Sequence, residues 1–297
     1  SSITIDPMNI LICSDAFPYV SISLRRYLPT DHIIPCPIQA INSRLPEVDV
    51  IIPAMHRIGE EEISITSARM IHQFGMGIEG VDIAAATRRG IYVANVPGSL
   101  ATGNSDSVAE HAIFLMLALA RQYPMAAKMF ETGIWGEPMG LSLRGKTVGI
   151  LGMGTIGKAL SRRLEPFQVR LLAIRRNPGI AKADELGLDF VGGPNELEYV
   201  LEQSDFLVLA LPATQETIGM IGKTQLSKLK DGAFVINVGR GAVLDQDALV
   251  RALDSGKVAG AGLDVFSEEP TDPGDALFGY NVVATPHIAG VTDVSYD

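Results

Sequence analysis

The chain has 297 residues, of which 47% are hydrophobic and 20% charged, a balance that excludes collagen-like, coiled-coil and disordered chains. A net charge of -10 argues against nucleic-acid binding as the main activity, because a phosphate backbone would be repelled. The longest unbroken apolar run, residues 112–120, is far shorter than the roughly 20 residues of a membrane-spanning helix, so no membrane partner is expected.

Two cysteines, Cys13 and Cys36, fit neither a disulfide framework nor a Cys-x-x-Cys pair. The first residues show no basic segment followed by an apolar stretch, so no signal peptide is expected. These features predict a reducing, cytoplasmic setting. The sequence contains no His-Glu-x-x-His motif, Cys/His cluster or repeated carboxylate loop, and therefore predicts no metal site.

The predicted elements alternate between short apolar strands and amphipathic helices. Strands are predicted first at 9–13, 48–52 and 90–94, and then at 147–151, 169–174, 206–211, 234–238, 260–265 and 281–284. Helices are predicted at 158–166, 197–203 and 245–255. The strands of the second series are nearly continuous runs of Val, Ile and Leu, which is typical of parallel sheets covered on both faces. We therefore expect an α/β protein with two doubly wound parallel sheets, the second domain being the larger.

A long helical stretch separates the two series. Ser107 and Glu110 form a capping-box pattern that predicts a helix start, with the helix running to about residue 121 and a further helical piece to about residue 131. Residues 133–140 hold the only tryptophan, Trp135, among glycines and a proline, and read as a loop. The crossing between domains is predicted near residues 97–104.

Two glycine-rich motifs compete as nucleotide sites. Residues 140–147 match the phosphate-loop pattern of ATPases and GTPases, but that pattern must follow a strand and open a helix, whereas here it precedes a strand. Gly152, Gly154 and Gly157 form a Gly-x-Gly-x-x-Gly motif that follows a predicted strand and precedes a predicted helix. In that context the three glycines permit a tight turn, a close approach to a pyrophosphate, and close packing of helix on strand. The sequence therefore predicts a dinucleotide site.

The next strand is followed by Arg175 and Arg176, where an NAD site usually has a carboxylate that binds the ribose hydroxyls. Guanidinium groups at this place would attract and bind the 2′-phosphate of NADP. We expect NADP(H) as the coenzyme and keep NAD(H) as the alternative.

Three polar residues follow later strands in apolar, glycine-rich surroundings: Arg240, Glu269 and His287. Ligands of open α/β sheets bind beyond the carboxyl ends of the strands, so these side chains are expected to face one crevice. An arginine can hold a carboxylate through two hydrogen bonds, and a histidine can exchange a proton near neutral pH. A carboxylate can orient that histidine. His32, His56, His72 and His111 are interpreted as structural hydrogen-bonding residues.

Over nearly its whole length the chain resembles the D-isomer-specific 2-hydroxyacid dehydrogenases. The matching segments are 107–111, 149–157, 211–214, 237–241, 261–266, 269–270 and 285–290. The resemblance implies a Rossmann coenzyme domain, residues 99–287, and a smaller flavodoxin-like substrate-binding domain, residues 1–98 with 288–297 returning to it. It also implies a homodimer built partly from the helical stretch after residue 100.

The resemblance further implies a role for each site residue. Arg240 would hold the substrate carboxylate and polarise its carbonyl, His287 would donate a proton to the carbonyl oxygen as NADPH delivers hydride, and Glu269 would pair with His287. Asp264 would hold the nicotinamide carboxamide. The other dinucleotide-binding positions would be Ser107, Thr155, Ile156, Leu211, Pro212, Thr217, Val238, Gly239 and Gly290. Met76 and Gly77 would meet the substrate carboxylate, and Met55 the substrate side chain.

Within this family the residues favour an oxidoreductase that reduces a small or apolar 2-oxo acid: glyoxylate, hydroxypyruvate or an aryl pyruvate. Formate dehydrogenases have an amide in place of Glu269. Phosphoglycerate dehydrogenases usually have Arg-Ser where this chain has Ala54-Met55, and keep the acidic residue that Arg175 replaces. Because His56 and Arg57 adjoin Met55, NAD-dependent 3-phosphoglycerate dehydrogenase stays an alternative. A second alternative is a protein that senses NADP(H) without turnover.

Overall fold

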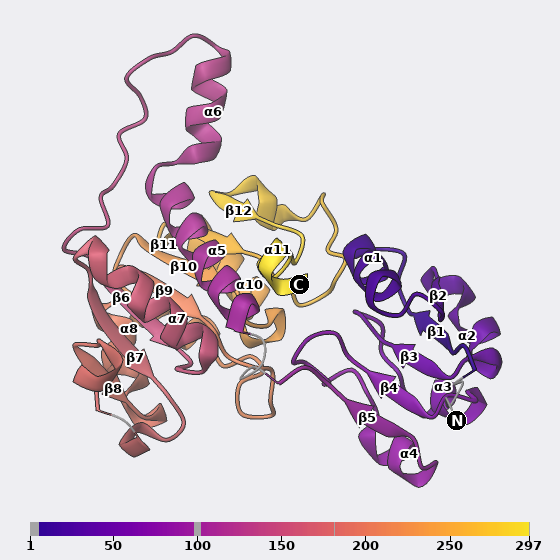
Figure 1. Ribbon diagram of the computed structural model, residues 1–297. Helices are drawn as coiled ribbons and strands as arrows, with labels where there is room; N and C mark the ends of the chain where they lie inside the picture. The colour runs from indigo at the N-terminus through magenta and orange to yellow at the C-terminus, as the bar shows by residue number, and fades with distance from the viewer. Residues whose placement is uncertain (1–5, 98–101, 181, 297) are drawn as a thin grey trace. The chain divides into compact units, whose positions relative to one another are not determined.

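The computed structural model describes residues 6–97, 102–180 and 182–296 (Figure 1). Residues 6–97 together with Tyr296 form one compact unit, and residues 102–180 with 182–295 form another. Each unit contains one parallel β-sheet flanked by helices, so the predicted α/β class with two doubly wound sheets is confirmed.

The first unit contains five parallel strands in the order β2-β1-β3-β4-β5. The strands are β1 (Asn9–Ile12), β2 (His32–Pro35), β3 (Val50–Ile52), β4 (Met70–His72) and β5 (Tyr92–Ala94). The helices are α1 (Pro18–Tyr27), α2 (Ile41–Arg44), α3 (Glu60–Ile65) and α4 (Ile83–Arg88). This strand order is that of flavodoxin-like sheets.

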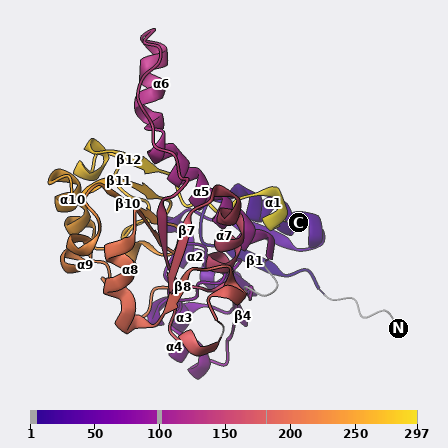
Figure 2. The ribbon, with the colours of Figure 1, turned by 90° about the vertical axis from the view of Figure 1, so that its left-hand side faces the viewer.

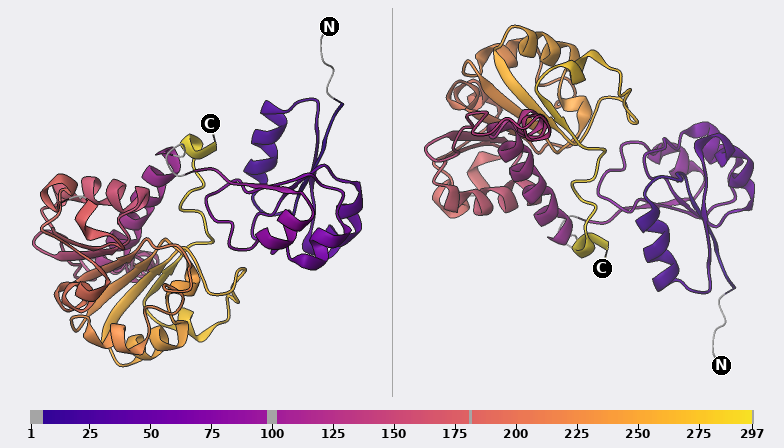
Figure 3. Two further views of the ribbon diagram at one scale, coloured as in Figure 1. Left: turned by 90° about the horizontal axis from the view of Figure 1, so that it is seen from below. Right: turned by 90° about the horizontal axis from the view of Figure 1, so that it is seen from above.

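Helices lie on both faces of the first sheet (Figure 3). The side chains that alternate along its strands form two cores, one on each face. Leu11 and Ile51 face the core that α2, α3 and α4 cover, whereas Ile10 and Ile52 face Val20 of α1 on the other side. Because successive side chains of a strand point to opposite faces, a strand buried on both sides is expected to be apolar at nearly every position.

The second unit contains seven parallel strands in the order β12-β11-β10-β9-β6-β7-β8. The strands are β6 (Thr147–Leu151), β7 (Arg170–Ile174), β8 (Phe190–Gly192), β9 (Phe206–Leu209), β10 (Ala233–Asn237), β11 (Val258–Leu263) and β12 (Val282–Ala284). The first strand of the unit, β6, lies between β7 and β9, so the chain builds outward on one side and then on the other. This is the Rossmann order, and its topological switch point lies between β6 and β9.

Helices cover both faces of the second sheet (Figure 2). One face packs against α5 (Thr102–Ala120) and α7 (Thr155–Leu164), and the other against α8 (Leu197–Gln203), α9 (Lys223–Lys228) and α10 (Gln246–Asp254). Val208 of β9 points toward α5 and α7, whereas Leu207 points toward α8, α9 and α10, and both side chains are fully buried. Two further helices are α6 (Tyr123–Glu131), which extends away from the rest of the unit in Figures 1 and 2, and α11 (Asp293–Tyr296).

The predicted capping box at Ser107 and Glu110 is wrong. Helix α5 already runs from Thr102, and Ser107 Oγ donates a hydrogen bond to the carbonyl oxygen of Gly103 at 2.8 Å, one turn earlier. A serine inside a helix commonly makes this bond, so the Ser-x-x-Glu pattern does not distinguish it from a cap. Helix α7 also begins three residues before its predicted start, because Gly154 takes the N-cap position.

Three strands, β2, β4 and β8, were not predicted from the sequence. Each has only three or four residues, and β2 and β8 lie at the edges of their sheets. An edge strand can expose side chains that a central strand buries, so β2 and β8 lack the continuous apolar run by which the central strands were found. The third strand, β4, lies inside its sheet but has only three residues, of which Met70 is exposed.

Residues 288–297 were expected to return to the first domain. In the structure, residues 288–295 belong to the second unit instead. Ala289 is buried in the core that lies beneath α5, and Thr292 Oγ1 hydrogen-bonds with Ser107 Oγ at 2.7 Å. These contacts hold the segment in the second unit. Tyr296, in contrast, packs against the α1 core of the first unit. Among the described residues, no helix combines the length and apolar character needed to cross a bilayer.

Candidate active site

The predicted dinucleotide motif forms the turn from β6 to α7. Gly152 has φ of +104°, and a Cβ atom there would collide with the carbonyl oxygen of Ala210. A Cβ atom at Gly157 would collide with the carbonyl oxygen of Gly152, so α7 can approach the turn only because position 157 has no side chain. Gly154, between them, faces open space, as the glycine that admits a pyrophosphate should.

The N-terminus of α7 has the features of an anion site. No side chain caps it, and no acidic residue lies in its first turn, which contains Thr155 and Ile156. Unsatisfied backbone N–H groups and the helix dipole together favour a bound negative charge. The turn and the helix therefore fit the pyrophosphate of a dinucleotide at the topological switch point of the sheet.

Arg175 and Arg176 directly follow β7, the strand adjacent to β6. Arg175 is half-buried, and its Nη1 atom is buried without a hydrogen-bond partner. A buried guanidinium nitrogen without a partner is costly, and an anion bound there would satisfy it. Arg176 is exposed. The hydrogen bond from Thr214 is the main cause that lowers the pKa of Glu216, and the charge of Arg176 acts in the same direction.

The other predicted dinucleotide residues follow strands of the same sheet. Leu211 and Pro212 come after β9, and Val238 and Gly239 after β10, so all four lie at the carboxyl edge. The hydroxyl of Thr217 lies within the loop after β9, donating to the carbonyl oxygen of Pro212 at 2.6 Å and accepting from the amide of Thr214 at 2.8 Å.

Ser107 and Gly290 are held by contacts within the second unit. The Ser107 hydroxyl binds the carbonyl of Gly103 and the hydroxyl of Thr292, and the residue is buried. Gly290 lies against the side chain of Asn104, which a Cβ atom at position 290 would hit. Their predicted contact with a dinucleotide stays a prediction.

Glu269 and His287 form a close pair. Glu269 Oε2 lies 2.7 Å from His287 Nδ1, and Glu269 Oε1 accepts a hydrogen bond from the backbone amide of Phe266 at 2.8 Å. A carboxylate can only accept hydrogen bonds, so Nδ1 is the donor in the bond that His287 shares with Glu269. Nε2 is then the nitrogen through which His287 can exchange a proton with a ligand.

The backbone at His287 is held in an uncommon conformation. Its φ is +55°, in the left-handed region that L-residues other than glycine, asparagine and aspartate rarely adopt. The amide of His287 donates to the carbonyl of Asp264 at 2.9 Å. The buried carboxylate of Asp264 accepts hydrogen bonds from the amides of Ile288 at 2.8 Å and Ala289 at 2.9 Å. These contacts hold in place a conformation that would otherwise relax.

Arg240 follows β10, the strand between β9 and β11. Its Nη1 atom donates to the carbonyl oxygen of Gly239 at 2.8 Å, and its own carbonyl oxygen accepts from Asn237 Nδ2 at 3.0 Å. The next residue, Gly241, lies so close to the backbone of Phe266 that a Cβ atom would overlap its carbonyl. The Arg240 segment therefore packs against the loop that carries Glu269.

Residues 113–289 match the family model described as "D-isomer specific 2-hydroxyacid dehydrogenase, NAD binding domain". The chain belongs to this family. The match covers the dinucleotide turn and all of Arg240, Glu269 and His287. In this 2-hydroxyacid dehydrogenase chain the strands β10, β11 and β12, which are neighbours in the sheet, each precede one of those three residues.

Similar proteins include two curated relatives and one solved structure. A glyoxylate reductase from Pyrococcus furiosus is 36% identical over 86% of this chain and 77% of its own length. A D-3-phosphoglycerate dehydrogenase from Archaeoglobus fulgidus is 40% identical over 82% of this chain, which spans only 45% of that relative. The crystal structure of a glyoxylate reductase from Paecilomyes thermophila has a TM-score of 0.78 at 30% identity, covering 98% of this chain and 92% of that one.

The substrate residues predicted in the first unit of this 2-hydroxyacid dehydrogenase chain lie on loops after β3 and β4. Met55 and Met76 are 46% and 40% exposed, and Gly77 follows Met76. Gln73, which the sequence analysis missed, joins the two loops: its Nε2 donates to the carbonyl of Ala54 at 2.9 Å. Asn95 Nδ2 donates to the carbonyl of Met76 at 2.6 Å. No local motif marks Gln73 or Asn95, because their partners are distant in sequence.

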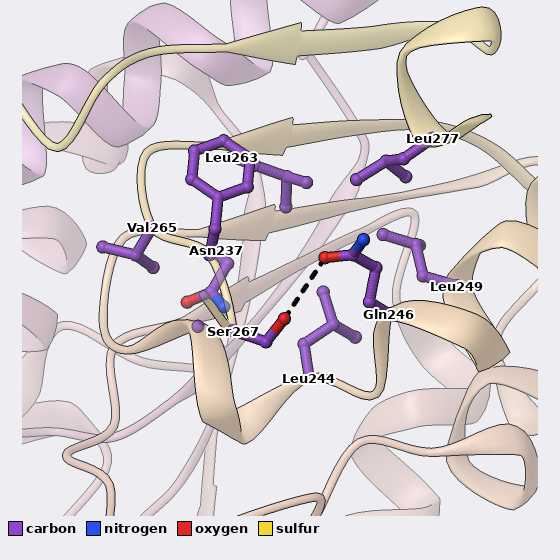
Figure 4. Close-up of a pocket in the computed structure, with 10 residues that line it drawn as sticks. Asn237, Leu244, Gln246, Leu249, Leu263, Val265, Ser267 and Leu277 are labelled. Atoms are coloured by element: carbon purple, nitrogen blue, oxygen red, sulfur yellow. Dashed lines mark hydrogen bonds between the residues drawn. The ribbon is translucent and has the colours of Figure 1, made fainter. Parts of the chain in front are cut away.

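A small cavity of about 10 Å³, enough for about one water molecule, lies beneath the loop between β11 and Glu269 (Figure 4). Leu249, Leu263 and Leu277 are among the residues that line it, and Ser267 Oγ donates to Gln246 Oε1 at 3.3 Å. The cavity is too small for a 2-oxo acid, so we treat it as packing space that supports the loop.

The competing phosphate-loop pattern at residues 140–147 leads into β6 and opens no helix, as its sequence context predicted.

Cys13 and Cys36 are buried and free, and burial raises the pKa of Cys13 to about 12, with a smaller contribution from Cys36. Among the described residues, no group of three or more His, Cys, Asp or Glu side chains is arranged to hold a metal ion.

Proposed function

We propose that this 2-hydroxyacid dehydrogenase reduces a small or apolar 2-oxo acid, such as glyoxylate, hydroxypyruvate or an aryl pyruvate, to the D-2-hydroxy acid with NADPH. The observation that carries the proposal is the Glu269–His287 pair, 2.7 Å apart, in the same unit as the open glycine turn before α7. A proton donor combined with a dinucleotide turn matches the two transfers that carbonyl reduction needs. The bound coenzyme would supply the hydride to the carbonyl carbon.

In this mechanism His287 supplies the proton. Its Nδ1 is held by Glu269, so Nε2 faces the substrate and donates its proton to the carbonyl oxygen as that oxygen gains negative charge. Glu269 stabilises the imidazolium form before transfer and keeps the ring oriented. The net reaction consumes the 2-oxo acid, NADPH and one proton, and yields the hydroxy acid and NADP⁺.

Arg240 would hold the carboxylate of the 2-oxo acid and stabilise the developing alkoxide. A guanidinium presents several N–H donors in one plane, and the bond from Nη1 to the carbonyl of Gly239 limits how the group can rotate. The backbone at Met76 and Gly77 would meet the substrate carboxylate, and the exposed side chain of Met55 would contact the apolar substituent of the substrate.

The preference for NADP(H) rests on Arg175. Its unsatisfied Nη1 and the neighbouring Arg176 suit a 2′-phosphate. None of residues 175–178, directly after β7, is a carboxylate that could bind the ribose hydroxyls of NAD. We expect Arg175→Asp to raise the KM for NADPH by about 100-fold and that for NADH by less than about fivefold, because only the phosphate meets the new negative charge. Initial rates with both coenzymes measure this.

Arg251→Asp is the matched control for Arg175→Asp, since it makes the same charge change at an exposed position on α10. It should leave both KM values within about twofold of the parent. Equal weakening of NADPH and NADH by Arg175→Asp, or a parent enzyme that clearly prefers NADH, would refute the NADP assignment.

The substrate class is tested by mixing the protein with NADPH and following absorbance at 340 nm with glyoxylate, hydroxypyruvate, phenylpyruvate and 3-phosphohydroxypyruvate. We expect turnover with at least one of the first three. The phosphoglycerate dehydrogenase relative and the basic residues His56 and Arg57 favour the fourth as the second candidate. Binding of NADPH without turnover of any acid would favour a sensing role.

We further propose that the protein is a homodimer that uses α6 and the following segment. Phe130 and Trp135 are 71% and 79% exposed, and their rings meet edge to face at 5.9 Å. Aromatic side chains exposed together in this way are typical of interfaces. We expect Phe130→Glu with Trp135→Glu to convert a dimer to a monomer in sedimentation velocity, because two buried carboxylates would oppose association.

Tyr92→Glu serves as the control for the dimer prediction, because Tyr92 is 74% exposed and lies on β5 of the first unit. This variant should sediment as the parent does. A parent protein that is monomeric at micromolar concentration would contradict the dimer proposal.

A further inference from the structure

A chain of hydrogen bonds joins helix α5 to the loop of His287. His111, on α5, places Nε2 2.8 Å from Thr285 Oγ1, and Thr285 Oγ1 donates to Asp264 Oδ1 at 2.6 Å. His111 Nε2 also lies 3.6 Å from Asp264 Oδ1. Thr285 begins the segment that contains His287, and Asp264 follows β11, so three distant parts of the sequence meet here.

The number of available protons fixes the direction of this chain. Asp264 accepts from a hydroxyl and two backbone amides, and a threonine hydroxyl has only one proton to give. That proton goes to Asp264, so Thr285 Oγ1 must accept from His111 Nε2–H. Burial lowers the pKa of His111, and the opposing effect of Asp264 is smaller. The hydrogen bonds from His111 to Thr285 and from Thr285 to Asp264 themselves require the donated proton to be on Nε2.

Asp264 transmits the arrangement to His287. Its Oδ1 atom accepts from Thr285 and from the amide of Ile288, and its Oδ2 atom accepts from the amide of Ala289. These two amides directly follow His287, whose left-handed φ of +55° they help to hold. Rotation of the carboxylate would release both amides together, and the hydrogen bond from Thr285 opposes that rotation.

We propose that His111 and Thr285 are positioning residues, which orient the Asp264 carboxylate so that the 285–289 loop presents the His287 imidazole to Glu269. This inference rests on the proposed function for its effect on turnover. It assigns His111 a part in the reaction beyond the structural hydrogen bond expected from the sequence. It also gives Asp264 a second role, beside the coenzyme contact that the family resemblance implies.

The first test compares Thr285→Val with Thr285→Ser. Valine keeps the shape of threonine but loses the hydroxyl, whereas serine keeps the hydroxyl. We expect Thr285→Val to lower kcat by roughly tenfold, because the Asp264 carboxylate loses the hydrogen bond that opposes its rotation. Thr285→Ser should stay within about threefold of the parent. A kcat for Thr285→Val within twofold of the parent would overturn the proposal.

A double-mutant cycle separates a connected chain from two independent structural effects. His111→Phe removes the donor and keeps an aromatic ring beside Phe114, which His111 contacts at 5.4 Å between ring centroids. We expect His111→Phe to lower kcat about fivefold, and the double variant with Thr285→Val to be no slower than Thr285→Val alone. Losses in kcat that multiply would show independent effects and contradict the chain.

Amide hydrogen exchange tests the geometry without any turnover. In Thr285→Val the amides of Ile288 and Ala289 should exchange at least about tenfold faster than in the parent, because their acceptor is no longer fixed. Thr285→Ser should match the parent. A parent inactive on every 2-oxo acid would refute the proposed function alone. Unchanged exchange at these two amides would refute the positioning chain whether or not the parent is active.

Discussion

Replacing His287 by alanine should lower kcat by about 10²-fold to 10³-fold while the KM for NADPH changes little. His287 Nε2 is the proton donor that the geometry supports, because Nδ1 is engaged with Glu269. A positioned proton donor contributes this much to a reaction in which an oxygen gains charge. Steady-state kinetics of 2-oxo acid reduction, with the coenzyme varied at saturating substrate, measure both quantities.

The control for this prediction is His32→Ala, which removes an exposed imidazole from the edge strand β2. It should leave kcat within about twofold of the parent. Glu269→Gln adds a graded test, since an amide still occupies the site but no longer stabilises an imidazolium. We expect a loss of kcat smaller than that of His287→Ala. Near-parental turnover of His287→Ala would remove His287 from the mechanism.

The central strands could be predicted because the sheets are covered on both faces. In β6 and β10 every residue is buried, which favours the nearly continuous apolar runs that the sequence shows; the polar residues Thr147 and Asn237 stand only at the strand ends. The edge strand β2 contains an exposed histidine and a proline and carries no such run. The start of α5 was misplaced because the Ser107 hydroxyl can bond backward to Gly103 as readily as it can cap a helix.

The dinucleotide turn could be predicted because local sterics fix the spacing of its glycines. Gly157 is an example: an added Cβ atom would collide with the carbonyl of Gly152, only five positions earlier in the same β6–α7 turn. The Glu269–His287 pair could be predicted from the resemblance to the family. The supports of the site could not be predicted in the same way. Thr285 binds His111, 174 positions away, and only the packing of α5 on the sheet brings them together.

Replacing Arg240 by alanine should lower kcat/KM for the 2-oxo acid by about 10³-fold, with the KM for NADPH within a few-fold of the parent. A guanidinium that holds the carboxylate and also faces the carbonyl oxygen stabilises the bound substrate, and stabilises the transition state more strongly. Its loss should therefore raise the KM for the 2-oxo acid and lower kcat. Arg240→Lys keeps the charge but loses the planar pair of donors, and should recover about tenfold of the loss.

Guanidinium ion added to the Arg240→Ala enzyme gives the sharpest form of this test. The vacated volume lies beside the carbonyl of Gly239, which binds Nη1 in the parent, so the free ion can occupy the same place. We expect rates to rise with guanidinium concentration in Arg240→Ala. In the parent and in the control Arg251→Ala, which removes an exposed arginine from α10, guanidinium should have no effect or should inhibit. If kcat/KM of Arg240→Ala stayed within fivefold of the parent, another group must hold the carboxylate. The loss of a bidentate hydrogen bond to a carboxylate would lower kcat/KM by more than that.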